Sequence, residues 1–354
     1  MRVVIAPDSF KGSISNSEAA GAIAKGWLII RPLDEVILLP MADGGEGTLE
    51  TIAVSQPDSI KVCFEADRSV YWLLLKDGTA IVELAAISGI TLLSNLDPMN
   101  SNTYRYGEVL KAAALDSRVK RIVATVGGSA STDGGVGALL ALGASFLDGK
   151  GESIPLGGIG LRDIANIDLL GLIAPPVGGV TCLVDVTNPL LGPLGSAQTF
   201  SPQKGANVDQ ILQLEAGLEH LKKISSQEDF AGAGAAGGTP FGLKLGWNVK
   251  IDSGAEVIAS LIGLPEAISA ADIVITGEGR LDLQSSFGKV VGAIRQFALN
   301  QGKRVFYCVG SSEEALDAEG IALIDIAPSM TEAMANPSKW LVIAGSELAK
   351  RVNS

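Results

Sequence analysis

Histidine and cysteine are nearly absent from this 354-residue sequence, which has one histidine and three cysteines. Cys63, Cys182 and Cys308 lie far apart in apolar segments, without metal-site or redox-motif spacing, so we expect reduced thiols in the core. His220 lies among charged residues near the end of an amphipathic helix, where we expect a structural role. These absences argue against a Ser-His-Asp triad, a conventional zinc site and histidine-based proton transfer. Carboxylates, lysines, hydroxyls and backbone N–H groups remain to carry any chemistry.

Long apolar runs and basic segments are also missing. No apolar run approaches the ~18 residues that span a bilayer, and the N-terminal run 1–6 is too short for a signal-peptide core. The net charge is −12, from 27 Lys and Arg against 39 Asp and Glu, which argues against nucleic acid and anionic membranes as partners. We therefore expect a cytoplasmic protein that binds small molecules. The sequence leaves its oligomeric state open.

Short apolar runs alternate with helical patterns, which is typical of an α/β protein with a largely parallel sheet. Ser15 and Glu18 form a capping-box pattern at the start of one helix, and Asp77-Gly78 marks a hairpin. The predicted strands are 3–6, 36–39, 61–64, 70–75, 80–83, 122–125, 181–184, 273–276, 305–309 and 322–326. The predicted helices begin at 15 and 48 and cover 107–115, 136–142, 208–224, 290–300 and 338–352.

Clean strand-helix alternation occurs at both ends of the chain. We therefore predict that residues 1–60 and 265–354 share one doubly wound parallel domain, and that 61–264 form an inserted α/β domain with a mixed sheet. Five apolar strands are each followed by a loop rich in glycine or acidic residues, namely 7–12, 40–48, 126–135, 184–189 and 276–282. Ligands of open α/β sheets bind at the carboxyl ends of strands, where such loops converge.

The glycine and the carboxylates of these loops point to phosphoryl transfer. Glycine lets backbone N–H groups approach an anion, and the next helix N-terminus adds positive potential. The neighbouring carboxylates suit Mg²⁺ or a base for a hydroxyl nucleophile. Lys11, Lys204 and Lys289 are candidate phosphate partners. The P-loop pattern is absent, and 232–237 fits G-x-G-x-x-G only after a polar segment that is no strand, so a packed Gly-Ala loop is the better interpretation.

The loops 7–12, 41–48, 202–206, 232–238 and 277–282 resemble those of the bacterial glycerate kinase family, in the same order along the chain. The resemblance implies Mg²⁺-dependent phosphorylation of D-glycerate by ATP, typically giving 2-phosphoglycerate, with 3-phosphoglycerate as the alternative. It also implies a flavodoxin-like domain built from both chain ends, an inserted α/β domain, and an active site in the cleft between the two. Three departures bear on substrate preference: Arg105 at an expected glycine, Ser131-Thr132 for Thr-Asn, and Leu283 for Gly.

Candidate site residues follow from the loops and the resemblance together. The catalytic candidates are Asp8, Lys11, Asp43 and Asp185, and the metal candidates are Asp43, Asp185 and Asp282. The candidates for binding substrate or phosphate are Ser9, Gly44, Gly45, Glu46, Ser129, Asn188, Lys204, Gly277, Glu278, Gly279, Arg280 and Lys289. Arg280 suits a carboxylate, which its guanidinium grips through two hydrogen bonds. The sequence does not separate base from metal ligand among the aspartates.

Three alternatives stay open. The chain could phosphorylate another small hydroxy acid, or it could bind an anionic metabolite without reaction. The density of carboxylates argues against the second, since an anion binder would avoid them. An oxidoreductase rests only on the displaced pattern at 232–237.

Overall fold

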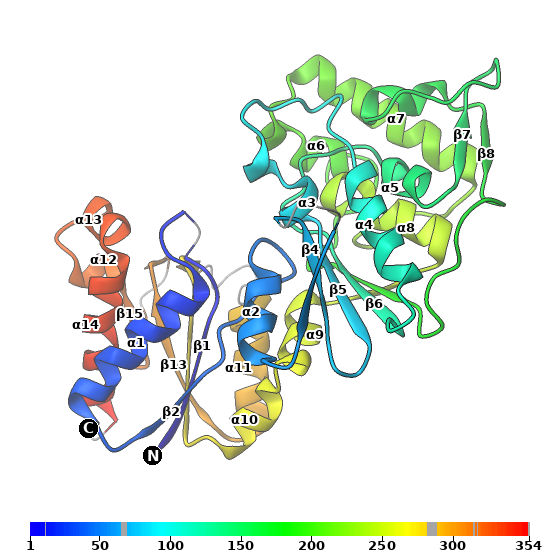
Figure 1. Cartoon of the computed structure of the whole chain (residues 1–354). Helices are drawn as coiled ribbons and strands as arrows, with labels where there is room; N and C mark the ends of the chain where they lie inside the picture. Colours follow the sequence, from blue (N-terminus) through cyan, green and yellow to red (C-terminus); the bar gives the residue numbers. More distant parts are fainter. Residues whose placement is uncertain (11, 65–68, 282–288, 314–315, 317, 353–354) are drawn as a thin grey trace. The chain divides into compact units, whose positions relative to one another are not determined.

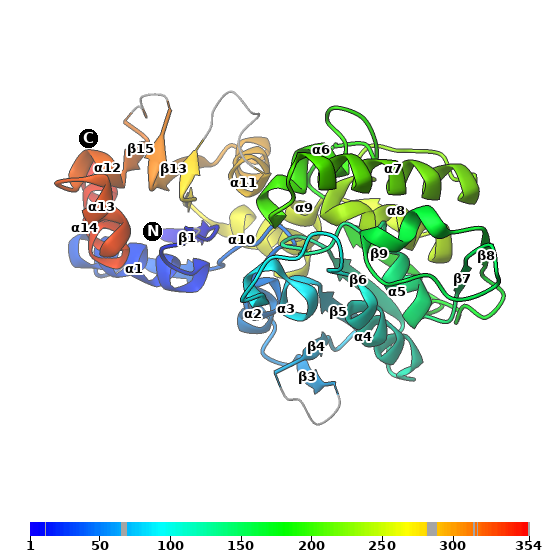
Figure 2. The same ribbon diagram turned by 90° about the horizontal axis from the view of Figure 1, so that it is seen from above.

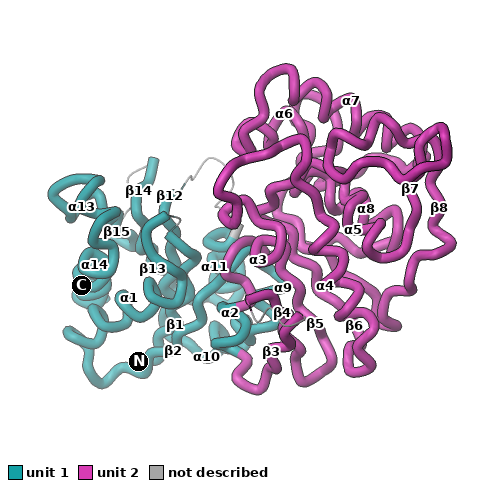
Figure 3. Tube along the Cα trace, turned by 45° about the horizontal axis from the view of Figure 1, so that its top comes forward, with its two compact units in different colours: residues 1–43, 50–55, 255–354 teal, residues 44–49, 56–254 magenta. Residues whose placement is uncertain are grey.

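The structure is a computed structural model that describes residues 1–10, 12–64, 69–281, 289–313, 316 and 318–352 (Figure 1). Of Lys289 only the backbone is described. The chain divides into two compact units, shown in two colours in Figure 3. Unit 1 consists of residues 1–43, 50–55 and 255–354, and unit 2 consists of residues 44–49 and 56–254.

Unit 1 is built on a parallel sheet of five strands. They are β1 (Arg2–Pro7), β2 (Glu35–Leu38), β11 (Ile273–Gly277), β13 (Arg304–Val309) and β15 (Gly320–Ala322), in the spatial order β2-β1-β11-β13-β15. Counted along the chain this is the order 2-1-3-4-5 of flavodoxin-like sheets. The predicted doubly wound sheet made from both chain ends is confirmed.

Alternate residues of these strands face opposite layers, as the two-residue period of a strand requires. Val3, Ile5, Ile275 and Phe306 pack in one core against α1 (Asn16–Ile30) and α14 (Pro337–Arg351), which lie side by side (Figure 1). The other face is covered by α11 (Lys289–Asn300), with α10 (Leu264–Ala270) beside it (Figure 2). Helices on both faces bury every central strand and leave the strand ends to the loops.

The first and last long helices approach each other at glycine. A methyl group on Gly26 of α1 would lie 2.0 Å from the Val342 carbonyl oxygen, and one on Gly345 would lie 2.3 Å from the Ile23 carbonyl oxygen. The capping box predicted for α1 is confirmed, because the Ser15 hydroxyl accepts from the Glu18 N–H and the Glu18 carboxylate accepts from the Ser15 N–H. The N–H groups at the start of α1 therefore have hydrogen-bond acceptors from residues next to them in the sequence.

The strand predicted at 322–326 is wrong. β15 ends at Ala322, and the next residues form α12 (Leu323–Ile326), followed by α13 (Met330–Ala335). A five-residue apolar run does not distinguish a strand from a buried helical turn by its period. Unit 1 also contains a small parallel pair of β12 (Arg280–Leu281) and β14 (Ser311–Ser312). The helices α2 (Thr48–Ser55) and α9 (Gly254–Leu261) lie where the chain passes between the units.

Unit 2 contains the mixed sheet expected for the inserted segment. Its six strands are β3 (Ile60–Cys63), β4 (Tyr71–Leu74), β5 (Thr79–Glu83), β6 (Arg121–Thr125), β9 (Val180–Leu183) and β10 (Lys250–Asp252), in the order β10-β9-β6-β5-β4-β3. The predicted hairpin is confirmed: β4 and β5 are antiparallel, with Gly78 at φ +88° in the turn. The neighbouring strands β5, β6, β9 and β10 are parallel to one another.

The helices of unit 2 enclose one large apolar core. They are α3 (Ala85–Ser88), α4 (Tyr104–Leu115), α5 (Val136–Ala141), α6 (Ser196–Phe200), α7 (Val208–Ser225) and α8 (Thr239–Trp247), joined by a small antiparallel pair, β7 (Ser145–Leu147) and β8 (Asn166–Asp168). His220 of α7 hydrogen-bonds through Nε2 to the Ile164 carbonyl oxygen at 2.6 Å, which fits the structural role expected for it. Cys182 and Cys308 are buried free thiols, but Cys63 lies exposed on the edge strand β3, so its assignment to the core is wrong.

Candidate active site

A cavity of about 480 Å³ lies in unit 1 where the strand order of the parallel sheet reverses. The reversal falls between β1 and β11, which are neighbours in the sheet with connections running in opposite directions. The loops that follow these strands separate there and leave a crevice, which is where open α/β sheets bind their ligands. Asp8, Ser9, Glu278, Gly279 and Arg280, all predicted site residues, line the cavity from these two loops.

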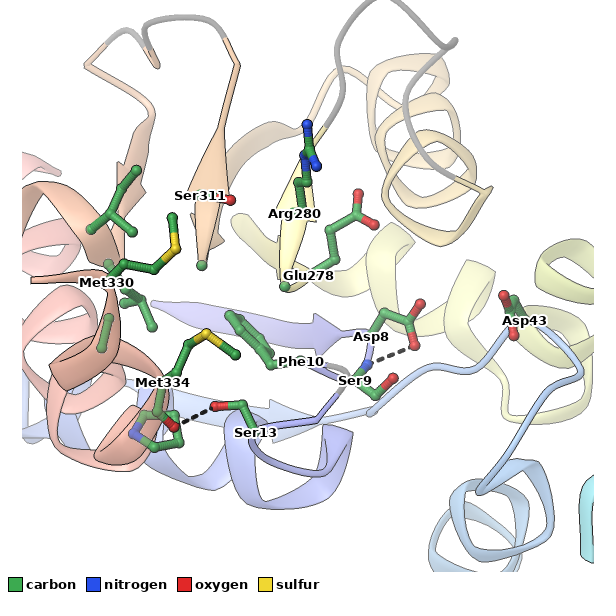
Figure 4. Close-up of a pocket in the computed structure, with 16 residues that line it drawn as sticks. Asp8, Ser9, Phe10, Ser13, Asp43, Glu278, Arg280, Ser311, Met330 and Met334 are labelled. Atoms are coloured by element: carbon green, nitrogen blue, oxygen red, sulfur yellow. Dashed lines mark hydrogen bonds between the residues drawn. The ribbon is translucent and has the colours of Figure 1, made fainter. Parts of the chain in front are cut away.

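Carboxylates form one end of this cavity. The Asp8 N–H donates to the Gly277 carbonyl oxygen at 2.8 Å, which continues the pairing of β1 with β11 up to the cavity. The segment after β2 likewise stays beside β1, because the Met41 N–H donates to the Pro7 carbonyl oxygen at 2.9 Å. Asp43 thereby joins Asp8 and Glu278 on the lining of the same cavity (Figure 4). Three adjacent strands each contribute one acidic side chain.

The carboxylates of this end are held in part by their own backbone. Asp8 Oδ1 accepts from the Ser9 N–H at 2.6 Å. Arg280 extends from β12, is largely exposed, and pairs with Glu313 at 2.5 Å. Three carboxylates against one arginine leave this end of the cavity acidic, so a polyphosphate would need a cation beside it.

Apolar side chains form the opposite end, and the sequence analysis missed them. Phe10, Leu323 and Ile324 line it together with Met330 and Met334, four residues apart on one face of α13 (Figure 4). Because residues 322–326 were predicted to form a strand, this segment was not assigned to the site. A methionine pair at helical spacing, in a chain with only five methionines, was the signal that could have found it.

The glycine loop before α2 binds a carboxylate of unit 2 itself. The N–H groups of Gly47 and Leu49, in the first turn of α2, donate to the two Glu83 carboxylate oxygens at 3.0 and 2.8 Å. Glu83 is almost fully buried at the end of β5. The positive helix end that we assigned to a phosphate beside Gly44 and Gly45 therefore has a partner from within the chain. Glu46, in the same loop, accepts from the Thr91 hydroxyl at 3.4 Å.

Lys204 is buried in unit 2, with 2% of its surface exposed. Its ammonium group donates to Ser129 Oγ at 3.0 Å and to the Ser131 carbonyl oxygen. Burial lowers the pKa of Lys204 to about 7, and the nearby Asp133 opposes this shift. The structure thus joins two predicted phosphate-binding residues, Ser129 and Lys204, through a direct hydrogen bond.

Asp133 is a buried carboxylate that the sequence analysis did not single out. Its Oδ2 accepts from the Thr103 N–H and hydroxyl, each at 2.8 Å, and from the Gly137 N–H at 3.2 Å, while Oδ1 accepts from the Gly135 N–H at 3.1 Å. Burial raises the pKa of Asp133, and these hydrogen bonds oppose the shift. Asp133 therefore caps α5 and ties the start of α4 to it.

Asp185 and Asn188 follow β9 and hydrogen-bond to different segments. Asp185 Oδ1 accepts from Ser253 Oγ at 2.8 Å and from the Gly254 N–H at 3.0 Å. Asn188 donates to the Leu194 carbonyl oxygen at 2.7 Å. The predicted residues Lys11 and Asp282, and the side chain of Lys289, lie outside the described residues.

Arg105, which replaces an expected glycine, lies on the surface of α4. Its guanidinium pairs with Glu108 at 3.1 Å and covers the Phe64 ring at 4.5 Å from the ring centroid. The 232–237 segment is a packed loop: a methyl group on Gly234 would lie 2.0 Å from the Pro189 carbonyl oxygen, so this glycine accommodates the chain's own backbone.

Two features are absent from the described part of the chain. Across that part, no three acidic, histidine or cysteine side chains lie close enough to form a metal site by themselves. Likewise, no helix within the described ranges is long and apolar enough to cross a membrane.

Comparisons with known proteins agree on one family. Residues 3–353 match the model of the glycerate kinase family. The chain is 38% identical over 333 residues to a glycerate kinase of Haemophilus influenzae, covering 90% of this chain and 88% of the relative. It is 38% identical over 328 residues to the glycerate 2-kinase of Escherichia coli K12, covering 88% and 85%. A crystal structure of a candidate glycerate kinase 2 from Salmonella typhimurium LT2 superposes with a TM-score of 0.80 at 33% identity, covering 100% of this chain and 98% of the other.

Proposed function

Because the chain belongs to the glycerate kinase family and is an ATP-dependent glycerate kinase, we propose that it phosphorylates the C2 hydroxyl of D-glycerate in a Mg²⁺-dependent reaction. The name of the E. coli relative, a glycerate 2-kinase, supports this choice of hydroxyl. The product is then 2-phosphoglycerate, and 3-phosphoglycerate is the alternative.

The observation that carries the proposed chemistry is the set of three carboxylates in the unit 1 cavity. Asp8, Asp43 and Glu278 follow three neighbouring parallel strands and line one end of the same space. Phosphoryl transfer needs one group to accept the proton of the attacking hydroxyl and others to hold a cation against the phosphates. Asp8 or Asp43 would serve as the base, and the remaining two carboxylates would hold the cation.

The donor set of this cavity fits Mg²⁺. Carboxylate oxygens are hard ligands, and Mg²⁺ is usually held by one or two protein carboxylates together with substrate phosphates and water. A site of that kind needs no cluster of three protein ligands, and none occurs in the described ranges. When bound, Mg²⁺ would neutralise charge on the ATP phosphates. Asp43 is one of its candidate ligands, and Asp185 and Asp282 remain candidates from the loops and the resemblance together.

Lys204 and Asp185 of unit 2 are proposed to be required for turnover as well. Among the described residues, Lys204 is the one buried lysine or arginine, and its pKa of about 7 would let an incoming anion shift it toward the charged form. Asp185 is held by two hydrogen bonds from the 253–254 segment.

Phosphorus NMR of the product tests the regiochemistry. The enzyme is incubated with ATP, MgCl₂ and D-glycerate, and a parallel sample receives EDTA. We expect 2-phosphoglycerate in the first sample and no product in the second. Formation of 3-phosphoglycerate would overturn the choice of hydroxyl, and turnover with EDTA would overturn the metal requirement.

Two substrate analogues test the choice of hydroxyl without the need to identify the product. D-Lactate keeps the C2 hydroxyl and lacks the C3 hydroxyl, whereas 3-hydroxypropanoate has the opposite pattern. ADP release with D-lactate alone supports transfer to C2. Release with 3-hydroxypropanoate alone contradicts it.

A further inference from the structure

We propose that the apolar end of the unit 1 cavity binds the adenine base of ATP, with Met330 and Met334 as the surface on which the base lies. The proposal rests on the ATP-dependent activity described above and adds to it the location of the base. The two methionines, together with Phe10, Leu323 and Ile324, give the cavity a wall that none of the proposed catalytic steps uses.

The chemistry of the two substrates decides which of them needs this wall. D-Glycerate is a three-carbon acid that carries a carboxylate and two hydroxyls, and it presents almost no apolar surface. Adenine is flat and aromatic, and burying it against apolar side chains is favourable. Methionine suits such a partner because its sulfur is polarizable and makes favourable contacts with aromatic rings.

The size of the cavity also exceeds what glycerate requires. Its volume of about 480 Å³ lies within the range of roughly 300–1,000 Å³ that is typical of sites for drug-sized ligands. A site for glycerate alone would leave most of this space to water. A nucleotide extends from an apolar base to a charged phosphate chain, and the cavity changes from apolar to acidic along its length (Figure 4).

The methionine side chains are accessible, although the helix that carries them is fixed. Met330 and Met334 are 59% and 54% exposed, whereas Phe10 and Leu323 beneath them are 3% and 1% exposed. Ser13 Oγ donates to the Met334 carbonyl oxygen at 3.0 Å, which ties α13 to the loop after β1. At the other end of α13, Ser329 Oγ accepts from the Glu332 N–H at 3.1 Å. The two thioethers thus lie on a fixed surface that faces open space, as a binding platform must.

This placement also orients the nucleotide. With the base on α13, the ribose and phosphates extend along the loops after β11 and β1 toward Glu278, Asp8 and Asp43, where the cation would be held. The reacting γ-phosphoryl group then lies at the end of the cavity that has the candidate bases. The reverse orientation would place the triphosphate against five apolar side chains and the adenine among three carboxylates.

NMR of methionine methyl groups tests the location without requiring turnover. The chain has five methionines, and only Met330 and Met334 are exposed residues of this cavity. The protein is labelled with ¹³C in the ε-methyl groups, the two signals are assigned with Met330→Leu and Met334→Leu, and Met99 in unit 2 serves as the internal reference. Adenosine and AMP are expected to shift both signals through the ring current of the base. Ribose 5-phosphate and D-glycerate, which lack the base, are expected to leave them unchanged.

Three results would overturn the proposal. The first is calorimetric binding of AMP with no shift of either methionine signal. The second is an equal shift with ribose 5-phosphate. The third is a shift that depends on protein concentration and not on adenosine, which would assign this surface to contact between two copies of the chain.

Steady-state kinetics separates this inference from the proposed function. We expect the Met330→Ala/Met334→Ala variant to raise the KM for ATP about tenfold, equivalent to ~1.4 kcal/mol from two sulfur–aromatic contacts, with kcat and the KM for D-glycerate within about twofold of the wild type. The matched control, Ile29→Ala/Leu299→Ala, truncates two similarly exposed residues of unit 1 outside the cavity and should change none of these values. An active wild type whose KM for ATP is unchanged in the methionine variant contradicts the inference alone. Absence of glycerate phosphorylation by the wild type contradicts the proposed function instead.

Discussion

The two units use acidic side chains at or beyond the ends of their strands in opposite ways. In unit 1, Asp8 and Glu278 line an open cavity at the reversal of the strand order. In unit 2, Glu83 and Asp133 are buried and accept hydrogen bonds from the N–H groups of the helices that follow nearby loops. A carboxylate at a strand end therefore either lines a cavity or caps a helix, depending on whether another acceptor satisfies the helix.

The caps explain this difference between the units. Helix α1 of unit 1 is capped by Ser15 and Glu18 from its own sequence, so the Asp8 carboxylate is not needed there. Helix α5 has a glycine at its N-cap with no side-chain cap hydrogen bond, and Asp133, just before it, accepts from its first N–H groups. At α2, the N–H groups of Gly47 and Leu49 donate to Glu83, which lies far away in the sequence. Each unsatisfied helix N-terminus attracts a negative group.

The largest expected effect is on turnover in unit 1. Replacing Asp43 by Asn keeps the shape of the side chain and removes its charge and basicity, so kcat should fall about 10³-fold, within the range for loss of a general base or an equivalent group. The thermal midpoint should change little, because Asp43 lies on the cavity lining. Asp58→Asn, at a largely exposed position, is the control. An Asp43→Asn enzyme with nearly full activity would remove this residue from the proposed machinery.

The next effect is on stability in unit 2. Asp133→Ala should lower the free energy of unfolding by about 3 kcal/mol, because it leaves buried N–H and hydroxyl donors without their charged acceptor. Asp133→Asn, whose amide oxygen still accepts hydrogen bonds, should lower the free energy of unfolding by a smaller amount. Urea unfolding measures both. If Asp133→Ala were as stable as the wild type, the contrast between the capping carboxylates of unit 2 and the cavity-lining ones of unit 1 would not hold.

Lys204 should make the stability depend on pH. Burial lowers its pKa to about 7 from an ordinary value near 10.5, so above pH 7 the unfolded chain binds a proton that the folded chain does not. The free energy of unfolding then rises with pH between about 7 and 10.5, by about 2 kcal/mol from pH 7 to 9. Lys204→Met should remove this contribution, which comparison of the two proteins by urea unfolding at each pH would reveal. Identical pH profiles would contradict the burial of an uncharged amine.

The smallest expected effect concerns the packing of unit 1. Gly26→Ala should destabilise the protein by about 1–2 kcal/mol, because the added methyl group meets the backbone of α14. The control is Gly21→Ala in the same helix, where a methyl group meets nothing within 4 Å and should stabilise the protein by roughly 0.5–1 kcal/mol. Thermal unfolding of the two variants should therefore give shifts of opposite sign. Shifts of the same sign would show that close approach at Gly26 does not limit the packing.

Much of the architecture was predictable because strands and caps leave local signals. The apolar runs located β1, β6, β11 and β13, and Ser15 with Glu18 located the start of α1. The order of the strands had no local signal, since it depends on how helices of both chain ends pack on the sheet. The prediction of a strand at 322–326 was wrong because this apolar run is too short to show a period.

The residues of the candidate site also divide into those that the sequence predicted and those that it did not. Asp8, Asp43, Glu278 and Arg280 were predicted to belong to a site because carboxyl ends of parallel strands gather their loops, and they line one cavity. Met330 and Met334 were missed because an exposed apolar side chain can be assigned to a binding surface only when the cavity beside it is known. Glu83 was missed as a cap because it lies 34 residues from the Leu49 N–H of α2 that it accepts from. Asp133 lies directly before α5 and was missed because its glycine-rich loop was interpreted as a ligand-binding loop.

Photoaffinity labelling with 8-azido-ATP tests most directly whether the carboxylate-lined cavity of unit 1 holds the phosphoryl donor. The reactive group is attached to the base, so the labelled peptide reports where the base lies. We predict labelling within residues 323–337, suppressed by ATP and unaffected by D-glycerate, as read by peptide mass spectrometry. ATP-suppressible labelling confined to peptides of unit 2 would contradict the assignment of this cavity to the nucleotide.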